Sequence, residues 1–254
     1  MLLRRITQHV KDQNWFAVFL DFFIVVVGVF VGMQVQQQYA ERARRVADGQ
    51  YMERLHTEIT DLVSIRENVI QPRHRNFDDL VTATDKIFSD AADVSLRTQE
   101  CAAIQLSHIF TNPTIDLPTV DELLSAGRLD SLSSQPIRNA IVRYTQSAAR
   151  ANDVIESINA GVLTLSRKYP NLIMLDAANT QDFGLILKSP LPECDLEGMR
   201  ANQGFKNDLA DNKSRFETYY LFTLVEPTNQ LRDIHDVLDA ELSIEHSVQE
   251  GSDS

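Results

Sequence analysis

The sequence predicts an all-α protein in which an N-terminal transmembrane helix continues into a stalk and then into an antiparallel helical bundle. Three observations favour this fold class. Residues 15–33 form an almost unbroken apolar run, apolar residues recur at spacings of three and four through most of the remaining chain, and that spacing breaks clearly near residues 171–193. We expect this last segment to be an irregular loop or a short hairpin, in which residues 172–175 pair with residues 183–187.

The predicted transmembrane helix covers residues 15–38. A bilayer core about 30 Å thick requires roughly 20 apolar residues in a helix, and the run from Trp15, interrupted only by Asp21, supplies nearly that number. Trp15 and Tyr39 are spaced to mark the two membrane interfaces, as aromatic belts do. The run is longer than the apolar region of a signal peptide, and Gln38-Tyr39-Ala40 does not fit a cleavage site. We therefore interpret it as an uncleaved anchor.

Four parts follow from this anchor. We expect a basic tail at residues 1–14, the transmembrane helix at 15–38, a helical soluble domain at 39–246 and a disordered tail at 247–254. The soluble domain begins with a stalk over residues 39–70, which should end before Pro72 because proline lacks the backbone N–H that a helix interior needs. The longest regular apolar stripe predicts a helix from Gln135 to Lys168.

The charge distribution excludes one class of partner and favours a topology. The formal net charge is −12, and a field of that sign repels phosphate backbones, so we expect no nucleic-acid partner. The positive-inside count is close to a tie, because three basic residues lie on each side of the span. The basic tail and a cysteine pair favour a soluble domain outside the cytoplasm. The six basic residues are Arg4, Arg5, Lys11, Arg42, Arg44 and Arg45.

Three residues inside the span indicate association with another membrane helix. Gly28 and Gly32 form a G-x-x-x-G motif, which lets a second helix approach closely. Asp21 is an ionisable group within hydrocarbon, which costs about 3 kcal/mol and usually faces a partner or water. A carboxyl tolerated near the interface is the alternative. A proton path is less favoured, because one carboxylate without a second ionisable group makes a poor relay.

Cys101 and Cys194 allow one intramolecular disulfide. A lone pair of cysteines often forms such a bond in an oxidising compartment. The alternative is two buried free thiols.

The remaining polar residues form no pattern of a catalytic, cofactor or metal site. The six histidines are scattered and none has a recognised ligand spacing, so we expect no metal. His235 lies near Asp233 and Asp236 and is a conceivable acid–base group, but a solvated helix face explains it better. No nucleophile elbow, P-loop or dinucleotide fingerprint occurs. We therefore expect no enzyme, although an unfamiliar one stays open. The histidines are His9, His56, His74, His108, His235 and His246.

Residues 14–35 (NWFAVFLDFFIVVVGVFVGMQV) and 51–55 (YMERL) resemble the opening of an uncharacterised bacterial family of single-pass inner-membrane proteins. Residues 123–129 (LLSAGRL) are similar to this family as well. Its members have one N-terminal transmembrane helix and a helical domain of unknown function. The resemblance covers residues 4–60 best and implies a location in a bacterial inner membrane. It implies no activity and no site residues.

These observations together predict a membrane-anchored, non-enzymatic interaction or scaffold module. We expect the lipid bilayer and a protein partner, or a second copy of the chain, as its binding partners. The alternative is a periplasmic ligand sensor. Because the N-terminal tail is too short for a signalling domain, such a sensor would pass its signal to a separate membrane partner.

Overall fold

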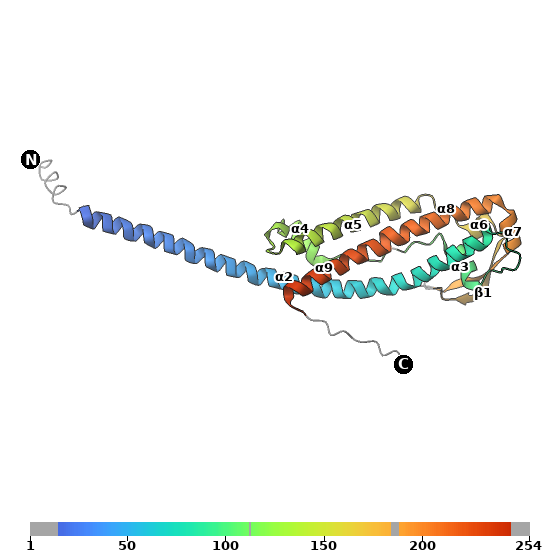
Figure 1. Ribbon diagram of the computed structural model, residues 1–254, viewed down its shortest axis with the longest axis horizontal. Coiled ribbons are helices and arrows are strands. Elements are labelled where there is room, and N and C mark those ends of the chain that lie inside the picture. The colour runs from blue at the N-terminus through green and yellow to red at the C-terminus, as the bar shows by residue number, and fades with distance from the viewer. Residues whose placement is uncertain (1–14, 112, 184–187, 245–254) are drawn as a thin grey trace, which may run out of the picture. The chain divides into compact units, whose positions relative to one another are not determined.

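The computed structural model describes residues 15–111, 113–183 and 188–244, without the side chains of residues 15–18 and 21. Most of this chain is helical, as predicted, and one two-stranded sheet accompanies the helices (Figure 1). The helices are α2 (Trp15–Phe88), α3 (Thr98–Leu106), α4 (Pro118–Ser125), α5 (Gln135–Asn159), α6 (Leu165–Lys168), α7 (Leu196–Ala201), α8 (Gln203–Tyr219) and α9 (Glu226–Leu242). The remaining elements are the 3-10 turn η1 (Leu129–Ser131), the π-helical segment η2 (Tyr220–Val225) and the strands β1 (Ile173–Gln181) and β2 (Ser189–Cys194).

The chain divides into two compact units, Met1–Tyr51 and Met52–Ser254. In the first unit, α2 carries the apolar run, and its described large apolar side chains from Phe19 to Val35 are all exposed. Their exposed fractions lie between 41% for Val27 and 67% for Phe22. α2 is long and apolar enough to cross a membrane.

The prediction that the stalk ends before Pro72 is wrong, because α2 continues through this proline to Phe88. A proline inside a helix removes one backbone hydrogen bond and crowds the preceding turn. Burial after the proline offsets that cost: Leu80, Ala83 and Ile87 are buried in the main core. The predicted helix over residues 135–168 is also interrupted, since α5 ends at Asn159 and α6 begins at Leu165.

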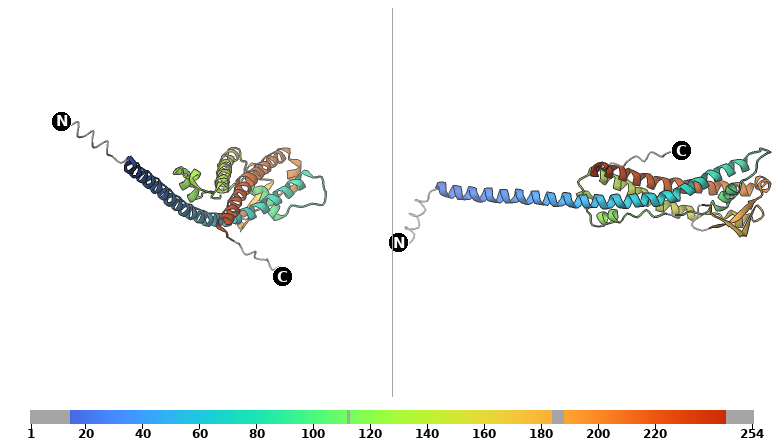
Figure 2. Two further views of the ribbon diagram at one scale, coloured as in Figure 1. Left: turned by 60° about the vertical axis from the view of Figure 1, so that its left-hand side comes forward. Right: turned by 90° about the horizontal axis from the view of Figure 1, so that it is seen from below.

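In the second unit, α8, η2 and α9 follow one another without a loop as a helical rod from Gln203 to Leu242. α5 packs against α9, η2 and α8, and its chain direction is opposite to theirs (Figures 1 and 2). The core is aromatic around α8, where the ring of Phe216 lies 6.2 Å from that of Phe77 and 5.6 Å from that of Tyr219. Such ring pairs add to the free energy of burying their apolar area.

The irregular segment contains an antiparallel hairpin of β1 and β2, in which Ile173 lies opposite Cys194. The expected partner strand is wrong. Residues 189–194 pair with β1, whereas residues 184–187, which fall within the expected strand, lie outside the described residues. A disulfide between Cys101 and Cys194 joins β2 to α3, with 5.8 Å between their Cα atoms.

Arg66 on α2 crosses the core to the rod and is completely buried. Its Nη2 donates to the carbonyl oxygens of Thr223 (2.7 Å) and Leu224 (3.2 Å), and its Nε donates to Thr228 Oγ1 (2.7 Å). Its Nη1 donates to the carbonyl of Thr114 (3.1 Å). Burial lowers the pKa of Arg66, which nevertheless stays protonated at neutral pH. The charge is therefore solvated by dipoles of the protein.

The rod supplies these carbonyls because its helical hydrogen bonding is interrupted at η2. In an α-helix the carbonyl of Thr223 would accept from the N–H of residue 227, but that residue is Pro227 and has no N–H. The hydroxyl of Thr228 donates to the Leu224 carbonyl (2.7 Å) and accepts from Arg66. Arg66 thus supplies a donor to the buried Thr223 carbonyl, which Pro227 leaves without its helical partner.

A second buried arginine, Arg73, fixes the extended segment between α3 and α4. Its Nη2 donates to Thr111 Oγ1 (3.2 Å), and Tyr219 donates its hydroxyl to the Thr111 carbonyl (2.7 Å). The hydroxyl of Tyr144 donates to the carbonyl of Ile115 in the same segment. Side chains from the three helices α2, α5 and α8 therefore hold this extended segment in the second unit.

We expect Arg66→Met to lower the free energy of unfolding by about 3 kcal/mol, because the carbonyls of Thr223 and Leu224 would lose a charged donor. Thermal denaturation of the purified chain, followed by circular dichroism, measures this loss. Arg54→Met is the matched control on α2, since Arg54 makes an exposed ion pair with Glu122 (3.0 Å) that is worth less than about 1 kcal/mol. Equal stability of the two variants would contradict the role assigned to Arg66.

Candidate functional site

Two histidines and one aspartate, from α2 and α9, converge at the surface of the second unit. Asp239 Oδ1 lies 2.9 Å from His56 Nε2, and Asp239 Oδ2 lies 3.1 Å from His235 Nδ1. The two imidazole rings stack with their centroids 4.8 Å apart. The exposed fractions of the three side chains are only 15–21%. We call these three residues the His–Asp cluster.

Helix geometry and apolar packing bring the His–Asp cluster together. His235 and Asp239 are four residues apart, so both project from one face of α9. Leu55 and Ile59 flank His56 on α2 and are buried, and Ile234 and Leu238 are buried beside the α9 residues. Buried apolar residues thus border the polar cluster on both helices. The cluster therefore lies at the edge of a packed helix seam, within reach of water.

In the His–Asp cluster, the two imidazole rings share the carboxylate of Asp239. With a hydrogen on Nε2, His56 donates to Asp239 Oδ1, while His235 Nδ1 lies at ion-pair distance from Asp239 Oδ2. The carboxylate also compensates the charge of either ring when that ring is protonated. The three donor atoms all lie within 4.8 Å of one another, a set that could hold a metal ion.

Sequence reasoning missed the His–Asp cluster. It placed His235 on a solvated face near Asp233 and Asp236, whereas the ring lies against His56 and Asp239. The i, i+4 pair of His235 and Asp239 is visible in the sequence. The contribution of His56 is not, because 183 residues separate it from Asp239.

The other histidines have different surroundings. His74 forms an i, i+4 pair with Asp78 (3.5 Å) and contacts the hydroxyl of Tyr220 through Nδ1 (3.0 Å). His108 contacts the carbonyl of Gln105, and burial lowers the pKa of its ring. The remaining two histidines, His9 and His246, lie outside the described residues.

The residues predicted to mediate membrane association lie on α2 in the first unit. An added Cβ at Gly28 or Gly32 would meet no atom within 4 Å beyond the neighbouring backbone, so both glycines face open space. Tyr39 is 69% exposed. The side chains of Trp15 and Asp21 lie outside the described residues. Of the predicted site residues, the structure brings together Cys101 and Cys194.

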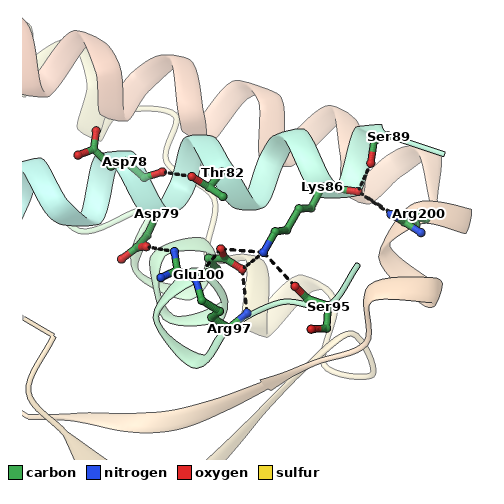
Figure 3. Close-up of polar contacts among 9 residues, drawn as sticks. All are labelled: Asp78, Asp79, Thr82, Lys86, Ser89, Ser95, Arg97, Glu100 and Arg200. Atoms are coloured by element: carbon green, nitrogen blue, oxygen red, sulfur yellow. Dashed lines mark hydrogen bonds and ion pairs between the residues drawn. The ribbon is translucent and has the colours of Figure 1, made fainter. Parts of the chain in front are cut away.

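A separate ion-pair cluster lies at the C-terminal end of α2 (Figure 3). The carboxylate of Glu100, on the first turn of α3, accepts from Lys86 Nζ (2.8 Å), Arg97 Nε (2.8 Å) and the Arg97 backbone N–H (2.8 Å). Arg97 also donates to Asp79 (2.9 Å). The backbone carbonyl of Lys86 accepts from Arg200 (2.9 Å). These contacts join α2, α3 and α7.

The electrostatics of Glu100 follow from these donors. Burial opposes its ionisation, but the hydrogen bonds from Lys86 and Arg97 outweigh burial and lower the pKa of the carboxyl. Asp79 has the opposite balance, because burial raises its pKa more than Arg97 lowers it. Glu100 is therefore the ionised centre of this ion-pair cluster. Its described partners, Lys86 and Arg97, hold parts of the fold together.

No family model, curated protein or solved structure matches this chain. The resemblance to a bacterial inner-membrane family therefore stays a prediction.

The lowered pKa of Glu100 predicts a stability loss in acid. Its contribution is fully present above the ordinary pKa of about 4.5 and is lost as pH falls through the lower value of the folded state. Glu100→Gln should destabilise the protein by roughly 1.5–3 kcal/mol at pH 7, and the gap to the wild type should shrink below about pH 4.5. Denaturation midpoints between pH 3 and pH 7 measure this change. Glu197→Gln, at an 84% exposed side chain, is the control and should match the wild type throughout.

Proposed function

We propose that this chain is a membrane-anchored, non-enzymatic interaction module. In this proposal residues 15–38 of α2 cross the bilayer. The helical second unit binds a protein partner and serves as an accessory or scaffold subunit of a membrane complex. The observation that carries the proposal is the exposed apolar surface of α2 in the first unit.

That surface needs an apolar environment. None of the most apolar window of α2 is buried within the protein, whereas the core helix of a soluble protein buries its apolar residues. The exposed side chains from Phe19 to Val35 lie on all sides of the helix, a distribution that is typical of a helix in lipid and not of one docking face. The length of the apolar run favours an anchor over a signal peptide.

The disulfide supports a location of the second unit outside the cytoplasm. Disulfides persist in oxidising compartments and are rare where thiols are kept reduced. Together with the resemblance to a bacterial inner-membrane family, the bond between Cys101 and Cys194 favours the periplasmic side.

Two features of the second unit support a binding role. Its buried charged residues Arg66 and Glu100 are engaged in contacts between helices, which is a structural use. At η2, the consecutive residues Leu221 and Phe222 are 44% and 38% exposed. A π-helical turn redirects side chains, and such turns often occur at functional sites. Adjacent exposed apolar side chains of this kind suit contact with a protein.

A ligand sensor is the second candidate, and the course of α2 favours it. The same helix contains the apolar run and the residue Arg66, which contacts η2. A ligand that shifted η2 would therefore act directly on α2, and a separate membrane partner would receive the change. A partner that co-purifies without added ligand supports the scaffold, whereas a partner that binds only with ligand supports the sensor.

The proposal predicts a stoichiometric membrane partner, or a second copy, that depends on the span. Gly28→Ile should reduce its co-purification from detergent by blocking close approach, and Asp21→Asn should reduce it if the charge makes the contact. Val29→Ile is the control, because it adds one methylene beside Gly28 without filling the glycine face. If the native protein co-purifies with no partner and does not associate with itself, the interaction role is wrong.

The periplasmic location has its own test. Alkaline phosphatase fused after residue 254 should be active in bacterial cells, because this enzyme folds only where its disulfides form. In the same cells, Cys101 and Cys194 should resist alkylation until a reductant is added. An inactive fusion together with freely alkylated thiols would place the second unit in the cytoplasm.

A further inference from the structure

We propose that His56, His235 and Asp239 bind a divalent transition-metal ion of the zinc class, which bridges α2 and α9. This inference is independent of the proposed interaction role, because it uses only the geometry of the His–Asp cluster. The two helices already hold the three donor atoms within 4.8 Å of one another.

The distances suit a tetrahedral ion after small side-chain movements. Zinc bonds nitrogen and carboxylate oxygen at about 2.0–2.2 Å, so neighbouring ligand atoms in a tetrahedron are roughly 3.4 Å apart. The two contacts of Asp239, at 2.9 and 3.1 Å, are slightly shorter than this. A rotation of the Asp239 carboxylate opens the required space, and both imidazole rings turn out of their stacked arrangement, because a metal ion lies in the plane of each imidazole that it binds.

The donor set selects the class of ion. Imidazole nitrogens suit zinc, copper, nickel and iron, whereas magnesium and calcium prefer six or more oxygen ligands. Two imidazoles and one carboxylate give three protein ligands. Because the side chains are partly exposed, water takes the fourth position, as it does in open zinc sites.

Binding requires a change of tautomer in both rings. His56 would coordinate through Nε2 and His235 through Nδ1, the atoms that face Asp239. The hydrogen on each of these nitrogens moves to the other nitrogen of its ring, so both imidazoles stay neutral and Asp239 stays ionised. The ion then replaces the His56–Asp239 hydrogen bond and the His235–Asp239 contact by three coordinate bonds, which tie the two helices more firmly.

Calorimetric titration tests the site on the full-length, tag-free protein in detergent, after treatment with a chelator and dialysis. One equivalent of Zn²⁺ should bind, and Mg²⁺ should not bind. Co²⁺ should give the visible absorption bands of a tetrahedral complex. Zn²⁺ should also raise the midpoint of thermal unfolding.

Variants assign the ion to these residues. His56→Gln, His235→Gln and Asp239→Asn should each weaken Zn²⁺ binding by more than about 100-fold, since even outer-shell changes cost 10-fold to 100-fold. His74→Gln is the matched control, because His74 and Asp78 form an i, i+4 pair on α2 like that of His235 and Asp239 on α9. It should bind Zn²⁺ like the wild type.

Two results would overturn the proposal. The first is a wild-type protein that binds no Zn²⁺, which would make the cluster a hydrogen-bonded helix contact only. The second is unchanged Zn²⁺ affinity in both histidine variants, which would place the ion elsewhere. Circular dichroism checks that each variant is folded. If His56→Gln unfolds the protein, His235→Gln and Asp239→Asn decide the outcome, because both ligands lie on α9.

Discussion

Arg66 reaches from α2 to the rod of α8, η2 and α9 and donates to the carbonyl of Thr223, for which Pro227 offers no N–H, and to the carbonyl of Leu224. The arrangement of the second unit depends on this contact. Without a donor at this position, the Thr223 carbonyl would lose the group that replaces the missing N–H of Pro227. Without these carbonyls, the buried guanidinium would keep only its contacts to Thr228 and to the segment before α4, and a buried charge short of polar partners is costly. Each partner makes the burial of the other possible.

The remaining polar contacts of α2 follow from the register that Arg66 fixes. His56 meets α9 on one side of Arg66, and Lys86 meets Glu100 of α3 on the other. Apolar burial alone tolerates a sliding of one helix along another, because it depends on area and not on direction. Hydrogen bonds at separate points along one helix do not tolerate it. The geometry of the His–Asp cluster is therefore tied to the other contacts that α2 makes within the second unit.

The helical class and the long N-terminal helix could be predicted from local sequence, because apolar periodicity is a local signal. The helix through Pro72 could not, since the burial of Leu80 and Ile87 that offsets the proline comes from distant segments. The candidate site could not be predicted either, because it also depends on contacts between distant segments. His235 and Asp239 form a local pair, but only the packing of α2 on α9 adds His56. The cysteines were an exception, because two thiols leave a single possible pairing within one chain.

The buried arginine also sets how much of the chain must be made before all its partners exist. Arg66 leaves the ribosome 157 residues before Thr223, its carbonyl partner on the rod. Until that later segment exists, Arg66 lacks its three partners on the rod, whereas the carbonyl of Thr114 is made earlier. Completion of the Arg66 site therefore joins one of the earliest segments of the second unit to one of the latest.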